Sequence, residues 1–304
     1  MKKNQRIMDF HHLKIFAAVY QYKSFTRASE QLNISQPTIS EHIKNLEAEF
    51  SCRLFDRLGR RIAPTPKADR LYPEVIRLLD ELEKLSEDFL YEDGLVRGNL
   101  IIGASTIPGT YILPALAARF RAAHPDTAFE IIINDTSKIA DMVLNHEIFI
   151  GVVGARKDSP LLQYRPFSKD ELVFVRARDY QSESLGTPLA DGPVILREEG
   201  SGTRVNMLRL LALSGIEIKE KRIAAILGSS ASVKEAVRAG LGISCLSRLA
   251  VQDELARGEF IEIPLPRQNM RRDFYLIRYT KRTMPNHYQA FWDYLRQTSL
   301  SEAR

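Results

Sequence analysis

Residues Ser24–Glu47, "SFTRASEQLNISQPTISEHIKNLE", contain two short amphipathic helical patterns separated by a very brief polar break. In the first pattern, Phe25, Ala28 and Leu32 recur at helical spacing and predict one buried face. The apolar residues of the second pattern recur at steps of four, three and four, at Ile39, Ile43, Leu46 and Phe50. Two helices fastened so closely across one another predict a helix-turn-helix, whose second helix can enter the major groove of DNA.

The break between the two patterns is suited to starting a helix. Ser35 can accept a hydrogen bond from a free backbone N–H of the next turn, and Pro37 lies in the first turn, where its missing N–H costs little. The outer face of the second helix carries mostly short or amide-bearing side chains, which can hydrogen-bond base edges. The residues of this helix expected to contact DNA are Gln36, Pro37, Thr38, Ser40, Glu41 and Lys44.

The stretch "LFDRLGRRIAPTP", Leu54–Pro66, has two short apolar segments that flank an arginine-rich tip. This pattern predicts a β-hairpin wing in which Arg57, Arg60 and Arg61 contact DNA phosphates. Such contacts position a protein on DNA without specifying sequence, and they make binding salt-dependent. A solvated basic loop that does not touch DNA is the alternative.

A long helix is predicted to follow, with Thr65 as its cap and Pro66 in its first turn. Its apolar residues form a heptad pattern: Leu71, Val75, Leu78, Leu82, Leu85 and Phe89. A lone helix with this seam needs a partner, and a second copy of the chain is the simplest one. The alternative is a helix packed on its own body domain. Pro73 is expected to bend the helix, and residues 91–94 are expected to form a hinge.

Charge is distributed unevenly along the chain. Residues 1–66 hold 11 Lys and Arg against 6 Asp and Glu, whereas the remaining residues hold 32 of each. A basic first segment indicates a module that binds a polyanion, and chance unevenness is the alternative. We therefore expect a winged helix-turn-helix DNA-binding domain at 1–66, a dimerisation helix with a hinge at 67–97, and a body domain at 98–304.

The body contains short β-branched segments such as "NLIIGAS", "FEIIIND", "FIGVVG" and "GISCLS", separated by helical or turn segments. This alternation predicts an open α/β sheet. Ligands of such sheets bind where strand ends face helix N-termini. Two junctions have hydroxyls at such places, one at Ser105 and Thr106 and the other at Ser201, Gly202 and Thr203. They offer an anion several donors, although such residues also commonly serve only as helix caps.

The stretch "FHHLKIFAAVYQYKSFTRASEQLNISQPTISEHIKNLEAEFSCRLFDRLGRRIAPTPKADRLYP" resembles the N-terminal region of LysR-type transcriptional regulators. The body agrees, since "GNLIIGAS", "ILPALAARFRAAHP", "IGVVG", "REEGSGTR" and "AVRAGLGISCLSRLAV" follow in the family's order. The resemblance therefore covers essentially the whole chain. It implies a sequence-specific DNA-binding transcriptional regulator, not an enzyme, whose promoter binding is modulated by a small effector.

The resemblance also implies an architecture and partners. The fold would be an α plus α/β arrangement with a winged helix-turn-helix, a linker helix and a two-lobed effector-binding domain like a periplasmic binding protein. Lobe I is expected at about 98–167 and 268–304, and lobe II at about 168–267. Family members are homodimers or dimers of dimers that bind interrupted palindromes in double-stranded promoter DNA. RNA polymerase is a further partner to consider.

The family positions coincide with both hydroxyl-bearing junctions. The implied effector-binding residues are Ser105, Thr106, Ser201, Gly202 and Thr203, with Thr136 after "FEIIIND" as a further candidate. Because these junctions are polar, we expect the effector to be a small anion, either a carboxylate or an inorganic oxyanion. The wording of "IGASTIPGTYILP" and "REEGSGTR" most resembles the subgroup that governs sulfur and related oxyanion metabolism.

Two residues depart from the common family pattern. Glu41 stands where many members have Arg or Lys, and its carboxylate either selects a cytosine amino group or remains at the rim of the groove. Phe149 stands where many members have Asp. The second change makes an inherited ligand contact at that strand doubtful but leaves the expected fold unchanged.

Other classes of protein find little support. The apolar run at the N-terminus is broken by charges, and no run of ~18 apolar residues appears, so neither a signal peptide nor a membrane span is expected. The histidines form no metal or catalytic motif, Cys52 and Cys245 form no pair, and no cofactor is expected. The rival class is a solute-binding protein or a small-molecule enzyme built on the body. A cytoplasmic location is the default, and Cys245 reads as a buried residue rather than a redox sensor.

Overall fold

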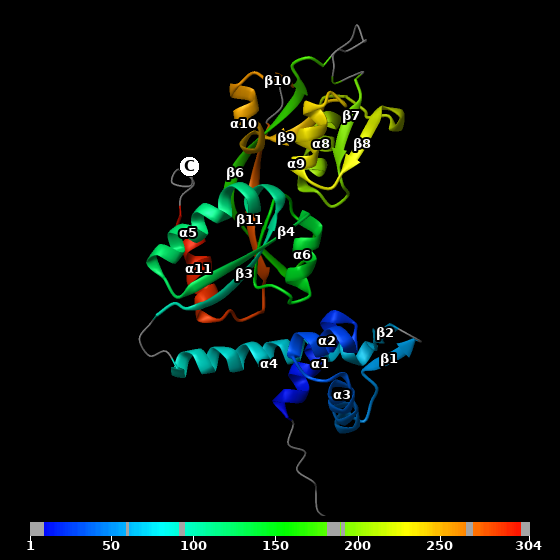
Figure 1. Ribbon diagram of the computed structural model, residues 1–304, viewed down its shortest axis with the longest axis vertical. Helices are drawn as coiled ribbons and strands as arrows, with labels where there is room; N and C mark the ends of the chain where they lie inside the picture. The colour runs from blue at the N-terminus through cyan, green and yellow to red at the C-terminus, as the bar shows by residue number, and fades with distance from the viewer. Residues whose placement is uncertain are drawn as a thin grey trace, which may run out of the picture. The chain divides into compact units, whose positions relative to one another are not determined.

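Figure 1 shows the computed structural model, which describes residues 9–58, 61–90, 95–180, 189, 192–265 and 270–298. The chain divides into two compact units. The first comprises Met1–Gly94 with Asn145–Glu147 and Arg282–Asn286, and the second comprises Leu95–Leu144, Ile148–Lys281 and His287–Arg304. Within the described ranges, none of the helices combines the length and the apolarity that a membrane span requires.

The first unit is a winged helix-turn-helix followed by a long helix. Its elements are α1 (Phe10–Tyr22), α2 (Phe25–Leu32), α3 (Gln36–Phe50), β1 (Phe55–Leu58), β2 (Arg61–Pro64) and α4 (Pro66–Leu90). The strands β1 and β2 form an antiparallel hairpin. The predicted helix-turn-helix and hairpin are therefore confirmed as structure.

Local capping sets the tight joint between α2 and α3. Ser24 Oγ accepts a hydrogen bond from the backbone N–H of Arg27 at 3.2 Å, which starts α2. Asn33 ends that helix at φ 54°, a left-handed conformation that Asn adopts more readily than most residues. Ser35 Oγ then accepts a hydrogen bond from Thr38 N at 3.3 Å and starts α3. The chain therefore changes direction within a few residues, as the sequence predicts.

An apolar core holds the helices of this unit together. Ile39, Ile43 and Leu46 of α3 are buried in a cluster with Phe16 and Val19 of α1. Burial of each large aliphatic or aromatic side chain contributes about 1.5–3 kcal/mol to stability. This core fixes which face of α3 remains outside.

The predicted heptad seam of α4 divides between two environments. Val75 is buried and Leu71 is partly buried against the same core as α1 and α3. Leu78 and Leu85, in contrast, are 37% and 53% exposed. The start of the seam therefore packs within the unit and is not available to a partner copy, whereas Leu78 and Leu85 remain available.

The sequence analysis made predictions for the start of α4, for Pro73 within it and for the segment that follows it. Thr65 Oγ1 accepts a hydrogen bond from Ala68 N at 3.3 Å, which confirms the predicted cap. The helix continues through Pro73 over 25 residues, and the bend expected there stays a prediction. The expected hinge at residues 91–94 lies outside the described residues.

The second unit is built on a mixed sheet with the strand order β10-β6-β11-β5-β3-β4, in which β9 also pairs with β6. The strands are β3 (Gly98–Ser105), β4 (Thr127–Asn134), β5 (Ile150–Val153), β6 (Leu162–Ala177), β9 (Ser244–Ser247), β10 (Phe260–Ile263) and β11 (Arg271–Tyr279). A separate parallel pair consists of β7 (Val194–Arg197) and β8 (Ile223–Leu227). Among these, β10 had not been predicted.

Helices pack on the strands in two lobes (Figure 1). One lobe contains α5 (Leu113–Ala123), α6 (Thr136–Leu144) and α11 (Asn286–Gln297), and the other contains α8 (Gly202–Leu213), α9 (Ser230–Arg238) and α10 (Arg248–Ala256). The long antiparallel strands β6 and β11 pass from one lobe to the other. The predicted two-lobed α/β fold is confirmed, whereas the predicted domain and lobe boundaries stay predictions.

The first helical segment of the second unit begins at the end of β3. Helical structure starts at Thr106, directly after β3, and includes the π-helical turn η1 (Pro108–Ile112) before α5. Gly109 allows this turn to lie on the sheet, because a Cβ there would come within 2.9 Å of the Ile133 side chain. Thr106 is therefore the first residue of a helical segment.

Candidate functional site

The face of α3 opposite its buried stripe carries the side chains expected to contact DNA. Most of them are exposed, namely Gln36, Pro37, Glu41 and Lys44, and the remaining two, Thr38 and Ser40, are half-buried. This arrangement gives α3 one polar face of donors and acceptors. The role of each residue at DNA stays a prediction.

Thr38 has a structural role besides the predicted one. Its Oγ1 lies 2.7 Å from Ser35 Oγ, so the two hydroxyls share a hydrogen bond at the start of α3. The backbone N–H of Thr38 also donates to Ser35 Oγ. The Thr38 hydroxyl is therefore partly committed to the helix cap and is less available to a base than the exposed side chains.

Glu47 fixes the hairpin to the last turn of α3. Its Oε1 accepts hydrogen bonds from Leu54 N at 2.7 Å and from Phe55 N at 3.2 Å. The sequence analysis did not single out Glu47. The feature that could have identified it is an acidic side chain near a helix C-terminus, where the helix dipole disfavours negative charge. The hydrogen bonds of Glu47 restrain the hairpin relative to the polar face of α3.

The predicted phosphate-contacting arginines belong to the hairpin. Arg57 lies on β1 opposite Ile62, and Arg61 lies on β2 opposite Leu58. The prediction for Arg60 lies outside the described residues. Contact of these arginines with phosphates therefore stays a prediction.

A cluster of histidines lies where α1 packs on α3. The ring centroid of His42 is 5.1 Å from that of His11 and 4.9 Å from that of His12. Burial lowers the pKa of His42, and the neighbouring imidazoles of His12 and His11 lower it further. His42 is therefore mainly uncharged near neutral pH. Among the residues that the structure describes, no group of His, Cys, Asp and Glu is arranged to hold a metal ion.

One cavity of the second unit gathers every residue predicted to bind the effector. It contains about 250 Å³ of space not filled by protein atoms, its mouth included. The lining residues are Ser105, Thr106, Ile107, Asp135, Thr136, Gly154, Arg197, Ser201, Gly202, Thr203, Arg272 and Phe274. Segments that are far apart in the sequence therefore meet around one small volume.

The cavity lies where strand ends meet helix starts. Ser105 ends β3, which runs parallel to β4, and Thr136 begins the helix α6 that follows β4. Ser201 occupies the N-cap position of α8, is 3% exposed, and makes no side-chain cap to that helix. Free backbone N–H groups and the positive end of the helix dipole favour an anion at such starts.

Gly202 lets α8 approach the end of β5 closely. A Cβ at this position would lie 2.9 Å from the carbonyl carbon of Gly154 and 3.0 Å from its oxygen. Any side chain at position 202 would therefore displace the start of α8. The contribution of Gly202 to the cavity is steric.

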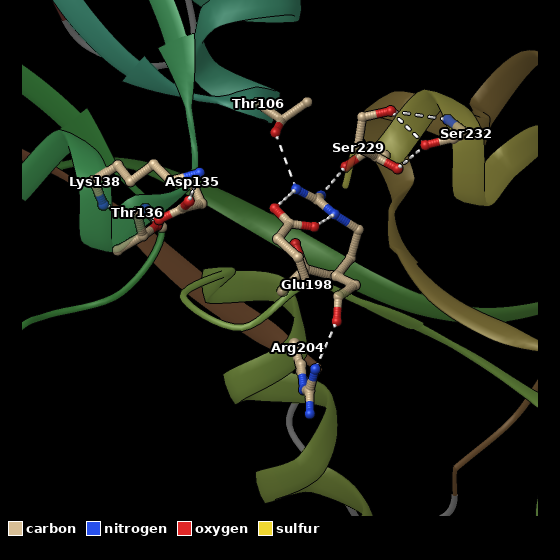
Figure 2. Close-up of polar contacts among 12 residues, drawn as sticks. Thr106, Asp135, Thr136, Lys138, Glu198, Arg204, Ser229 and Ser232 are labelled. Atoms are coloured by element: carbon tan, nitrogen blue, oxygen red, sulfur yellow. Dashed lines mark hydrogen bonds and ion pairs between the residues drawn. The ribbon is translucent and has the colours of Figure 1, made fainter. Parts of the chain in front are cut away.

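Arg197 supplies a buried positive charge that the sequence prediction did not single out. It ends β7, is 3% exposed, and donates hydrogen bonds to Thr106 Oγ1 at 3.2 Å and Ser230 Oγ at 2.6 Å. Its Nε and Nη2 donate to the two carboxylate oxygens of Glu198 at 2.7 and 2.6 Å. Figure 2 shows Thr106 and Glu198 joined to this guanidinium. The sequence feature that could have identified Arg197 is an arginine at the end of the apolar strand "VILREE".

A second buried arginine is held by its own carboxylate. Arg272 of β11 and Asp170 of β6 are register partners, and Arg272 Nε donates to Asp170 Oδ2 at 2.8 Å. Ser247 Oγ donates to the other oxygen of Asp170 at 2.6 Å. Arg272 Nη1 donates to Thr203 Oγ1 at 3.0 Å. Arg272 therefore orients Thr203, while its charge is balanced by Asp170.

The Thr136 hydroxyl also has a definite hydrogen-bond partner. Thr136 Oγ1 accepts a hydrogen bond from Gly154 N at 3.3 Å. Asp135, which precedes it, caps α6 by accepting from Lys138 N at 2.8 Å and pairs with Lys138 Nζ at 3.1 Å (Figure 2). The charge of Asp135 is thus balanced at the cavity wall.

Two residues singled out in the sequence lie away from this cavity. Phe149 packs against Tyr288 of α11, with ring centroids 4.6 Å apart, and does not line the cavity. Cys245 of β9 is 1% exposed, and burial raises the pKa of its thiol to about 12. Its thiol is therefore protonated and inaccessible, which agrees with the expected packing role.

Comparison with known proteins gives matches along the chain. The family model described as "Bacterial regulatory helix-turn-helix protein, lysR family" matches residues 10–69, and "LysR substrate binding domain" matches residues 93–299. The HTH-type transcriptional regulator YeiE of Escherichia coli (strain K12), whose function is described as uncharacterized, is 34% identical over 292 residues. That alignment covers 93% of this chain and 95% of YeiE.

Solved structures show the same fold. A full-length OxyR variant from Pseudomonas aeruginosa matches with a TM-score of 0.72 at 20% identity, covering 97% of each chain. The regulatory domain of CcmR from Synechocystis PCC6803, solved in complex with 2-PG, matches with a TM-score of 0.58 at 26% identity. This match covers 66% of this chain and 96% of the CcmR domain.

Proposed function

The chain belongs to the LysR family of DNA-binding transcriptional regulators, and we propose that a small anion bound in the cavity around Arg197 modulates its promoter binding. The observation that carries this proposal is the convergence of Ser105, Thr106, Thr136, Ser201 and Thr203 on one cavity that also contains a buried guanidinium. The anion is a carboxylate or an inorganic oxyanion. The relatives are transcriptional regulators, which argues against a catalytic role.

The proposed DNA contact uses α3 for bases and the β1–β2 hairpin for phosphates. The exposed polar face of α3 offers Gln36, Glu41 and Lys44 to the major groove. The arginines of the hairpin would release counterions from the phosphates on binding, so affinity would fall with salt. The target is an interrupted palindrome in double-stranded promoter DNA.

A palindromic target requires two reading helices. The exposed apolar residues Leu78 and Leu85 of α4 support a homodimer formed by that helix, and pairing of dimers would give a tetramer. RNA polymerase is a further proposed partner at the promoter. We place such a regulator in the cytoplasm, together with the DNA it binds.

The electrostatics of the cavity support an anionic effector. The start of α8 provides a helix N-terminus without a side-chain cap, and Arg197 adds a buried guanidinium whose charge is paired with Glu198. The CcmR regulatory domain, which is 26% identical, has been solved in complex with 2-PG, so a related domain accommodates a ligand. A neutral apolar ligand would gain little from these groups.

The test removes two hydroxyls of the cavity while the DNA-binding unit is left unchanged. Thr106→Ala combined with Ser201→Ala should abolish the effector response of the full-length protein. Operator affinity without effector should remain within about threefold, a difference below ~0.7 kcal/mol. Calorimetry with sulfate, phosphate, acetate and malonate measures binding directly.

The matched control is Thr110→Ala combined with Thr280→Ala, which removes two exposed hydroxyls from the same unit. This control should bind the anion as the wild type does. Undiminished binding of the identified effector by the Thr106/Ser201 variant would contradict the site. A preference for neutral apolar ligands would contradict the anionic class.

A further inference from the structure

We propose that Glu198 is a built-in competitor for the effector anion, which must displace the Glu198 carboxylate from Arg197 in order to bind. This inference rests on the proposed function, because it concerns the same cavity. It adds a counter-charge that the chain itself supplies to Arg197, and it defines the ligand more strictly.

The geometry of the Arg197–Glu198 pair is that of a bound ligand. One carboxylate oxygen accepts from Nε at 2.7 Å and the other from Nη2 at 2.6 Å. Such a two-point contact is the manner in which a guanidinium holds a carboxylate or an oxyanion. The best anion-binding edge of Arg197 is therefore already filled by the next residue of the chain.

The burial of the two side chains differs, and this difference makes exchange feasible. The Arg197 side chain is 4% exposed, so its charge requires a partner at all times. The Glu198 side chain is 23% exposed and can move toward solvent. An incoming anion can therefore replace one carboxylate by another negative group without leaving the guanidinium unpaired.

The other arginine of the cavity shows the contrasting arrangement. Asp170, the partner of Arg272, has a side chain only 1% exposed, and Ser247 Oγ holds it with a further hydrogen bond. Its register position on β6 opposite Arg272 fixes it in the sheet. Exchange is therefore directed to Arg197, while Arg272 remains a fixed support for Thr203.

The exchange defines the ligand more closely than the polarity of the cavity does. The effector needs two oxygens that span Nε and Nη2 of one guanidinium, as a carboxylate, sulfate or phosphate group has. It must also bind tightly enough to outcompete a carboxylate tethered beside the site, whose effective concentration is high. Neutral ligands are excluded, because they would leave Arg197 without a counter-charge once Glu198 departs.

The exchange also reaches the contact between the lobes. Arg197 Nη2, which binds Glu198, donates in addition to Thr106 Oγ1 at 3.2 Å. Arg197 is the last residue of β7 in one lobe, whereas Thr106 directly follows β3 in the other lobe. A ligand that repositions the guanidinium therefore changes a hydrogen bond between the lobes, and so favours one lobe arrangement over another.

The decisive variant is Glu198→Gln in the full-length protein, titrated by calorimetry with sulfate, phosphate, acetate and malonate. The amide keeps the size of the side chain but removes the competing charge. We expect binding of the preferred probe to strengthen by about tenfold or more, equivalent to ~1.4 kcal/mol. The matched control is Glu199→Gln, since that neighbour is 92% exposed and lies 4.0 Å from Arg204. The control should bind within about twofold of the wild type, well below a tenfold change.

A second variant keeps the inference testable if Glu198→Gln does not fold. Glu198→Asp retains the charge but shortens its reach, so it should weaken the two-point contact and strengthen probe binding by a smaller factor. If the wild type binds a probe and the Glu198 variants bind it equally or more weakly, Glu198 supports Arg197 and the inference is wrong. If neither the wild type nor the variants bind any probe, the anion proposal falls together with the inference.

Discussion

At the scale of the residue, several polar side chains of this regulator serve the fold and the sites together. Thr38 shares a hydrogen bond with the cap of α3, and Glu47 anchors the hairpin to the end of the same helix. In the cavity, Arg197 joins Thr106 and Ser230 while it holds the Glu198 carboxylate. Substitutions at such residues change both stability and binding, so exposed side chains give cleaner tests of recognition.

Gln36 is the exposed residue best suited to a test of base reading. It lies in the first turn of α3 and can form paired hydrogen bonds to a base edge. Gln36→Ala should weaken binding to the preferred operator by ~1–3 kcal/mol and relax preference at one position per half-site. Titration of operator variants at one fixed salt concentration measures both effects.

A control for this variant is Gln31→Ala, which removes an exposed amide from α2 instead of α3. It should leave base preference unchanged. An equal loss of affinity for every DNA sequence in the Gln36 variant would show a backbone contact rather than base reading.

At the scale of the element, α3 depends on a single side-chain cap. Ser35 Oγ accepts from Thr38 N and shares a further hydrogen bond with the Thr38 hydroxyl. Helix starts that lose such a cap leave a backbone N–H without its partner. The short joint between α2 and α3 sets the angle between these helices, so the cap stabilises the position of the polar face of α3 as well as the helix itself.

Ser35→Ala should therefore lower the free energy of unfolding by ~0.5–2 kcal/mol. Urea unfolding followed by circular dichroism measures this change. Ser51→Ala, at the other end of the same helix, is the control because Ser51 occupies the C-cap with its backbone. That variant should stay within about 0.5 kcal/mol of the wild type. A Ser35 variant as stable as the control would show that the cap contributes nothing.

At the scale of the whole molecule, the proposed assembly uses the exposed apolar residues Leu78 and Leu85 of α4. Val75 is committed to the core of the first unit, whereas Leu78 and Leu85 present apolar surface. A palindromic target needs two DNA-binding units, so a partner for this surface would link assembly to operator binding. Sequence analysis offered a partner copy or the body domain as cover for the α4 seam, whereas the start of the seam packs on α1 and α3.

Leu78→Asp combined with Leu85→Asp should give monomers and abolish tight operator binding, because each change would bury a carboxylate in the proposed seam. Sedimentation velocity measures the assembly state. Arg70→Asp combined with Arg77→Asp has the same spacing on exposed positions of α4 and should leave the dimer intact. Dimers that survive the leucine changes would place the interface elsewhere.

Local patterns were sufficient for much of the fold. The caps at Ser24, Ser35 and Thr65 and the apolar stripe of α3 act within a few residues of one another, so the sequence alone determined the helix-turn-helix and the start of α4. Alternation of β-branched segments and helices likewise determined the α/β class of the body. The hydroxyls at strand–helix junctions were predictable because their backbone setting is also local.

Tertiary structure alone decided how distant residues combine. Arg197 and Thr106 are separated by 91 residues, and Arg272 and Asp170 by 102, so no local pattern shows that they meet. The division of the α4 seam was likewise hidden, because a heptad pattern records that a face is apolar but not which surface covers it. The physical reason is the same in each case: charge pairing and burial depend on chain segments that only the folded sheet and core bring together.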